Sequence, residues 1–283
     1  MLTHKSPSLT ASAALIALAV TVGIQACAPS PSDTANASQS ISVSAQPSGE
    51  TSSKLSATAS QPAPPLQPPA PGWEIVGTSV QGTPIRVLTV GQGPRKVLFI
   101  GGIHGDEPEG AVAAAELPSA FHEAGLADSV TLTILQDANP DGRAAATRGN
   151  ANGIDVNRNF PASNFDRTDP SNGGQPLSEP EARAVHDTID RVNPNLVLVM
   201  HSWSGREFIN FDGPAREIAE QFSTSSGLPV EESSAFAPTP GSLGSYFGRD
   251  RGIPVLTIEV VKGSDPRAVW ERLRPALLQA IGG

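Results

Sequence analysis

Three short segments of the chain are mostly apolar, and they constrain the fold more than any other feature. They are residues 96–100, 196–200 and 254–259. Successive side chains of a strand point to opposite faces, so a continuous apolar run has no polar face to expose to water. Such runs therefore form strands that are buried on both faces of a sheet. Helical patterns at 109–121 and 180–192 lie between the first two runs, those at 215–226 and 242–250 lie between the second and third, and one at 265–281 closes the chain. The sequence therefore predicts an α/β fold, with a mixed, mostly buried β-sheet flanked by helices on both faces.

Further elements complete this prediction. Residues 74–78 and 85–88 carry β-branched side chains on either side of a Gly-containing turn, which indicates a hairpin, and 130–136 is typical of another strand. The segment 139–175 is rich in Asn, Asp, Gly and Pro and predicts a long functional loop. The sequence Ser178-Glu179-Pro180-Glu181 predicts a capping box that opens the helix at 180–192.

The first 72 residues differ in composition from the rest of the chain. Residues 1–26 combine a short basic start with an apolar run that is too short to span a bilayer comfortably, which predicts a signal peptide of the lipoprotein type. It ends before Cys27, the single cysteine, which we expect to be lipidated. Residues 27–72 are rich in Ser, Ala and Pro and predict a disordered tether. The single folded domain is expected at 73–283.

This pattern predicts an exported lipoprotein that faces the periplasm or cell wall. The N-terminal lipid would anchor it in a membrane. One attached diacylglycerol brings two acyl chains, which suffice for stable anchoring. The net charge is −9, and no cluster of Lys and Arg is present. Because binding to phosphates needs a positive face, we expect no nucleic acid partner.

Acidic and imidazole side chains follow the three apolar runs. His104 and Glu107 come shortly after the first, His201 directly follows the second, and Glu259 ends the third. Ligands bind at the carboxyl ends of strands in open α/β sheets, and catalytic zinc takes three ligands of these types. The pattern His-x-x-Glu alone is weak. His104 could equally be a hydrogen-bonded loop residue, and Glu107 a solvated residue at a helix start.

Several other motifs strengthen the metal-site interpretation. Over residues 73–283 the chain resembles the zinc carboxypeptidase family, the peptidases related to carboxypeptidase A. The resemblance rests on Gly101-Gly102-Ile103-His104-Gly105-Asp106-Glu107, Asn139-Pro140-Asp141-Gly142, Arg148, Asp155-Val156-Asn157-Arg158-Asn159-Phe160, His201-Ser202-Trp203-Ser204 and Thr257-Ile258-Glu259. It implies a zinc metallopeptidase with one Zn²⁺ per chain, held by His104, Glu107 and His201.

The resemblance also implies roles for the remaining motif residues. Glu259 would be the general base, and Arg148 would stabilise the developing oxyanion. Asn157 and Arg158 would bind the terminal carboxylate of a peptide substrate, a task that suits the planar guanidinium fork. Asp155 would hydrogen-bond the first metal-binding histidine and fix its tautomer.

Within the family, the segments 148–162, 178–181 and 239–242 resemble the murein peptide amidases. This implies hydrolysis of the γ-D-glutamyl to meso-diaminopimelate bond in cell-wall muropeptides. Three alternatives remain: an exported carboxypeptidase for ordinary peptide C-termini, an N-acyl amino acid deacylase, and a non-catalytic wall-binding lipoprotein. Two features depart from that branch. Residues 235–238 lack the substrate-binding Tyr of many relatives, and the lipid anchor contrasts with the cytoplasmic setting of murein recycling.

Overall fold

The computed structural model describes residues 72–232 and 239–283. The signal peptide, Cys27, the segment 235–238 and all of the tether except its last residue, Gly72, lie outside the described residues. Within the described part, no helix is both long enough and apolar enough to cross a membrane. The first element, strand β1, begins at Trp73.

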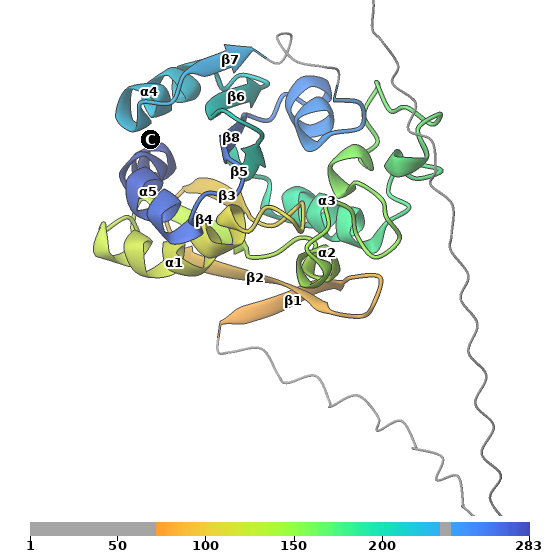
Figure 1. Cartoon of the computed structure of the whole chain (residues 1–283). Coiled ribbons are helices and arrows are strands. Elements are labelled where there is room, and N and C mark those ends of the chain that lie inside the picture. Colours follow the sequence, from red (N-terminus) through yellow and green to blue (C-terminus); the bar gives the residue numbers. More distant parts are fainter. Residues whose placement is uncertain (1–71, 233–238) are drawn as a thin grey trace, which may run out of the picture. The chain divides into compact units, whose positions relative to one another are not determined.

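One sheet of eight strands runs through the described part, in the order β1-β2-β4-β3-β5-β8-β6-β7 (Figure 1). Its central strands β4, β3, β5 and β8 are mutually parallel, whereas β1, β2 and β6 pair antiparallel with their inner neighbours. The strands are β1 (Trp73–Thr78), β2 (Pro84–Gly91), β3 (Arg95–Ile100), β4 (Val130–Leu135), β5 (Leu196–Trp203), β6 (Phe208–Asp212), β7 (Val230–Glu232) and β8 (Val255–Val261).

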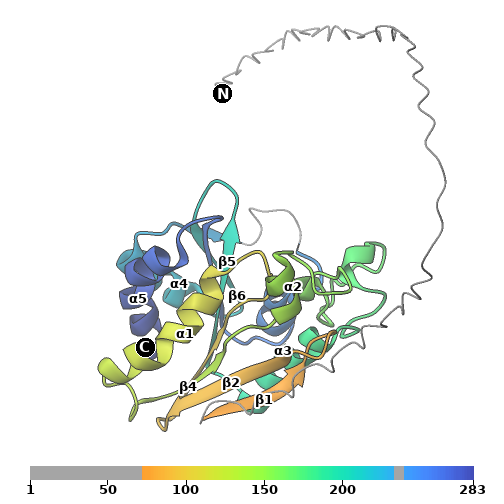
Figure 2. The ribbon, with the colours of Figure 1, turned by 60° about the horizontal axis from the view of Figure 1, so that its bottom comes forward.

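Helices cover both faces of this sheet. Figures 1 and 2 show α1, α4 and α5 on one side and α3 on the other. A π-helix at Gly244–Asp250 packs on the same side as α3, where Phe247 joins the buried cluster. The α-helices are α1 (Glu109–Glu123), α2 (Pro140–Ala145), α3 (Pro180–Val192), α4 (Arg216–Ser226) and α5 (Pro266–Gly282).

Alternation along the central strands explains this layering. In β3, Val97 and Phe99 pack into the cluster beneath α1 and α5, whereas Leu98 and Ile100 pack into the cluster beneath α3. All four side chains are fully buried. A strand that feeds two cores needs apolar residues at successive positions, which is the pattern in the sequence. The predicted α/β class with helices on both faces is confirmed.

The structure corrects two local predictions. Helix α3 begins at Pro180 with Glu179 as its N-cap, and no side chain caps it, so the predicted capping box is wrong. Ser178 instead donates its hydroxyl hydrogen to Glu179, and Glu181 accepts from the backbone N–H of Val80 on the neighbouring hairpin. The predicted long loop at 139–175 also contains α2, whose N-cap Asn139 accepts from Gly142 N.

Candidate active site

The turn after β3 brings the first two candidate ligands to the carboxyl end of the sheet. Gly102 has φ of +64°, and a Cβ there would lie 2.4 Å from an Asp137 carboxylate oxygen, so glycine is required at this position. The turn is tied to the end of β4 by hydrogen bonds from Ala138 N and Asn139 N to the carbonyls of Gly101 and Gly102. These contacts fix the position of the turn that leads to His104 and Glu107.

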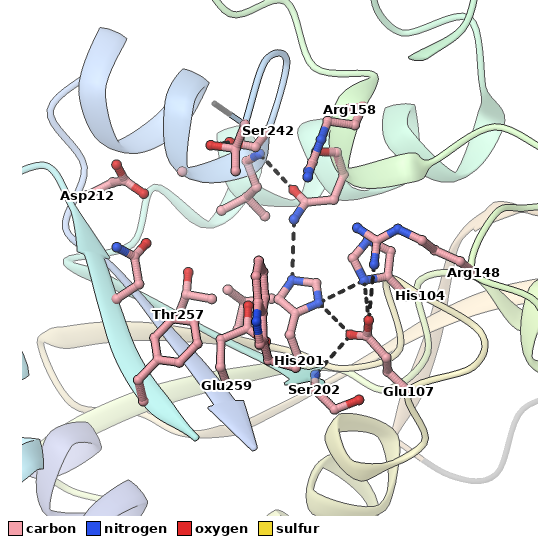
Figure 3. A pocket seen from close by; sticks show the side chains of 18 residues that line it. His104, Glu107, Arg148, Arg158, His201, Ser202, Asp212, Ser242, Thr257 and Glu259 are labelled. Carbon is pink, nitrogen blue, oxygen red and sulfur yellow. Dashed lines mark hydrogen bonds and ion pairs between the residues drawn. The ribbon is translucent and has the colours of Figure 1, made fainter. Parts of the chain in front are cut away.

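His104, Glu107 and His201 form one buried group (Figure 3). The Nδ1 atoms of the two histidines are 3.1 Å apart, and each lies 2.9 Å from a different carboxylate oxygen of Glu107. Zinc bonds of about 2.0–2.1 Å in tetrahedral geometry place neighbouring donors about 3.3 Å apart. The donor types and their spacing therefore fit a zinc ion, and the same three residues are the ones that the sequence predicts.

Glu107 carries the negative charge of this group. Burial alone would raise the pKa of the Glu107 carboxyl, but hydrogen bonds from His104 and His201 outweigh burial and hold its pKa below the usual range. The backbone N–H of Ser202 donates to the same carboxylate at 3.1 Å. Glu107 is thus held as an anion, the form that binds a metal ion.

Asp155 and Arg148 support the group from one side. Asp155 Oδ1 lies 3.1 Å from His104 Nε2, so the Nδ1 atom of that ring is directed toward the other donors. Arg148 donates from Nε to Asp155 Oδ2 at 2.9 Å and from Nη1 to Glu107 Oε1 at 3.2 Å. The Arg148 side chain is 44% exposed, so its guanidinium borders both the buried carboxylates and the open cleft.

Asn157 and Arg158 lie in a short 3₁₀ turn, Val156–Arg158, that Asp155 caps by accepting from Asn157 N. The Asn157 amide is engaged within the protein: Nδ2 lies 3.3 Å from His201 Nε2, and Oδ1 accepts from Leu243 N at 2.9 Å. Arg158 donates from Nη1 to the Asn157 carbonyl at 2.8 Å. Burial lowers the pKa of Arg158, although the nearby Asp155 opposes this effect. Both residues line the cleft.

Glu259 lies beside the donor group on β8, as the register partner of His201 on β5. It is 9% exposed, and among the described residues no group hydrogen-bonds its Oε2 atom. Burial, followed by the negative charge of Glu107, raises the pKa of Glu259 to about 8. A buried carboxyl of raised proton affinity that faces a cleft is suited to exchange protons with a substrate or with water.

The floor of the cleft is one face of three adjacent strands. Register pairs His201 with Glu259 and Glu259 with Phe208, and it pairs Thr257 with Asn210. Asp212 lies two residues further along β6 and is also part of the lining. Sequence reasoning did not identify Asn210 and Asp212, although their alternation with apolar residues in β6 is the signal that could have found them.

Two histidines and a glutamate in a buried group, beside a buried carboxyl at the carboxyl end of a mixed α/β sheet, define a metal-dependent hydrolase. A family model described as zinc carboxypeptidase matches residues 72–227, over half of the chain. The chain belongs to the zinc carboxypeptidase family and is a zinc metallopeptidase.

Particular relatives agree with this assignment. Murein peptide amidase A of Escherichia coli K12 is 30% identical over 206 residues, which cover 67% of this chain and 81% of that protein. The solved murein-tripeptide amidase of E. coli O157 superposes with a TM-score of 0.59 at 26% identity, over 76% of this chain and 93% of the other. Carboxypeptidase A of Helicoverpa armigera shares the fold, with a TM-score of 0.60 at 18% identity, over 74% and 66% of the two chains.

Proposed function

We propose that the chain hydrolyses peptide bonds near a free C-terminal carboxylate, and that its substrate is the γ-D-glutamyl to meso-diaminopimelate bond of murein peptides. One observation carries the catalytic part of this proposal: three buried metal donors share a cleft with the buried carboxyl of Glu259. The similarity to murein peptide amidases carries the choice of substrate.

In the proposed mechanism His104, Glu107 and His201 would hold one Zn²⁺ per chain. Zinc in such a site supplies a Lewis acid that polarises the scissile carbonyl and lowers the pKa of water. Glu259 accepts the proton of the attacking water and returns it to the leaving amine. The half-exposed guanidinium of Arg148 stabilises the negative charge that develops on the carbonyl oxygen.

Substrate orientation is assigned to Arg158 and Asn157. The Arg158 guanidinium lines the cleft, and its planar fork matches a terminal carboxylate through paired hydrogen bonds. Asn157 steadies His201 and the backbone at Leu243 through its amide, so it would contribute to substrate binding from a fixed position. Recognition of a free carboxylate restricts hydrolysis to the end of a peptide.

Asp212 supports a substrate whose C-terminal residue carries a second amino group. It lies four residues along β6 from Phe208, the register partner of Glu259, which corresponds to about 13 Å of strand. It is 7% exposed and pairs with Arg249, with 3.2 Å between Oδ1 and Nε. A Cβ on Gly244 would lie 2.1 Å from Asp212 Oδ2, so glycine leaves room for this carboxylate. The distal end of diaminopimelate carries an ammonium group beside a carboxylate, and Asp212 would bind the ammonium group.

Product analysis tests the proposed reaction. The full chain would be incubated with L-Ala-γ-D-Glu-meso-diaminopimelate and, in parallel, with ordinary peptides. We expect free diaminopimelate, and its release should stop on chelation and return with zinc. Release of ordinary C-terminal residues alone would retain the zinc peptidase and overturn the murein substrate. No product from either substrate by a zinc-loaded chain would contradict the proposed activity.

Asp212→Asn tests the substrate assignment separately from catalysis. The substitution keeps the shape of the side chain but removes a charge-assisted hydrogen bond. We therefore expect kcat/KM for the diaminopimelate substrate to fall about 10- to 100-fold. Substrates that end in an uncharged side chain should change little. Asp128→Asn, at an exposed position, provides the matched control. An equal loss on both kinds of substrate would remove Asp212 from substrate selection.

We also propose export and lipid anchoring, on the basis of the sequence before Cys27. Cells that express the chain would be labelled with palmitate, and the label on the protein would be compared with that on Cys27→Ser. We expect the variant to carry no label and to be absent from the membrane fraction. Equal labelling of the two proteins would contradict lipidation at this residue, and would leave the peptidase assignment unaffected.

A further inference from the structure

A second cavity lies away from the catalytic cleft. Its volume is 530 Å³, within the range of small-molecule sites. The walls come from α1, α2, the start of α5, the beginning of β2 and the residues that follow β4. In Figure 1, strand β2 runs beneath α1 and α2. Three arginines line this cavity, namely Arg86, Arg143 and Arg267.

Arg86 is the central observation. It lies on β2 and is half-buried. Among the residues that the structure describes, none forms an ion pair or hydrogen bond with its side chain, and its Nε atom is buried without an acceptor. A buried guanidinium N–H without an acceptor is costly, because it has given up water without replacement. Protein atoms cover this Nε, so a ligand in the cavity would meet the outer nitrogens of the guanidinium, which also have no partner in the described part of the chain.

Arg143, on α2, adds a second guanidinium to the lining of this cavity. Its Nε atom binds Asp137 and its Nη2 atom is covered by the protein, which leaves Nη1, without a partner in the described part of the chain, as the donor that a ligand would reach. Arg267 is 72% exposed and pairs with Glu116, with 3.1 Å between Nη2 and Oε1. The cavity is thus lined by three guanidinium groups and two carboxylates, an excess of one positive charge in a chain whose net charge is −9.

We propose that this cavity binds a small oxyanion, a carboxylate or a phosphate, through Arg86 and Arg143. The guanidinium group presents its N–H donors in a plane, which matches the oxygens of either anion. Asp137 and Glu116 occupy part of the positive charge, so the remaining excess suits one anionic group. The site is separate from the zinc donors, and the proposal stands independently of the substrate of the catalytic cleft.

Titration calorimetry on the zinc-loaded full chain tests the site, with inorganic phosphate in one arm and succinate in the other. We expect saturable binding at one site in at least one arm, and the arm with the higher affinity identifies the oxyanion. Arg86→Gln should weaken that binding about 10-fold or more, because it removes a charged donor. Arg167→Gln makes the same change of charge at an exposed arginine that does not line the cavity, and should bind as the parent does.

Three results would overturn the proposal: no saturable binding in either arm, equal affinity in Arg86→Gln, or equal loss in Arg86→Gln and Arg167→Gln. The second result would also be obtained if the anion bound at the zinc, since Arg86 does not line the catalytic cleft. If Arg86→Gln fails to fold, Arg86→Lys keeps the charge but loses the planar fork. It should then bind about 10-fold more weakly than the parent, and parent-like affinity would contradict the assignment.

Discussion

Replacing Glu259 by Gln is expected to lower kcat on the murein tripeptide about 10³-fold, because general base catalysis contributes about 10²- to 10⁴-fold and an amide cannot accept the proton of water. Glu259 is not one of the metal donors, so the variant should retain one zinc per chain. Its KM should change little, since the loss falls on the chemical step. Single-turnover kinetics measure the rate of the chemical step, and metal analysis of the same sample measures the zinc content.

The control for this substitution is Glu123→Gln, which makes the same chemical change at an exposed position at the end of α1. It should leave kcat unaltered. If Glu259→Gln kept its zinc and also most of its activity, another group would have to be the base, and the cleft would need a different mechanism. If the variant also lost its zinc, the assignment of Glu259 as a base that does not bind the metal would be wrong.

Replacing His201 by Ala is expected to remove the bound zinc and, with it, all measurable hydrolysis. Substituting a residue that merely orients a ligand weakens metal binding about 10- to 100-fold, so the loss of one of three direct ligands should cost at least about 100-fold in affinity. The metal content after dialysis should fall from one zinc per chain to nearly none. Atomic absorption and the tripeptide assay provide the two measurements.

His122→Ala is the matched control, because it deletes an exposed imidazole on α1. Its zinc content and activity should equal those of the parent protein. A His201→Ala variant that kept full zinc occupancy would show that the metal is held elsewhere. If such a variant had also lost hydrolysis, that loss would be assigned to the broken contact with Asn157 and not to the metal.

The central part of the fold could be predicted because strands that are buried on both faces appear in the sequence as continuous apolar runs. The edge of the sheet could not. Strand β7 has three residues, too few to show any period. Strand β6 carries Asn210 and Asp212 on its cleft face, so its apolar pattern is interrupted where the lining is polar. The absence of a side-chain cap on α3 reflects tertiary contacts. Val80 and Asn150 donate to the Glu181 carboxylate, and Asn159 donates to the Ser178 hydroxyl, so the side-chain groups that a capping box would use are already engaged.

The candidate site was predictable to the extent that its residues follow buried strands. His104, Glu107, His201 and Glu259 do so, and the structure brings them together. Their wider surroundings depend on chain crossings that no local pattern encodes. The contact between Asn157 and Leu243 joins segments 86 residues apart, and the pairing of Asp212 with Arg249 joins β6 to the π-helix.

The pairing of His201 with Glu259 across β5 and β8 makes enzymatic activity sensitive to strand register. Successive side chains of a strand point to opposite faces, so a slip of one residue between these strands would turn one of the pair away from the cleft. Such a molecule could still be compact and largely α/β by circular dichroism. Turnover per folded molecule would therefore measure how many refolded molecules have the correct strand register. Spectroscopy of secondary structure does not distinguish the two registers.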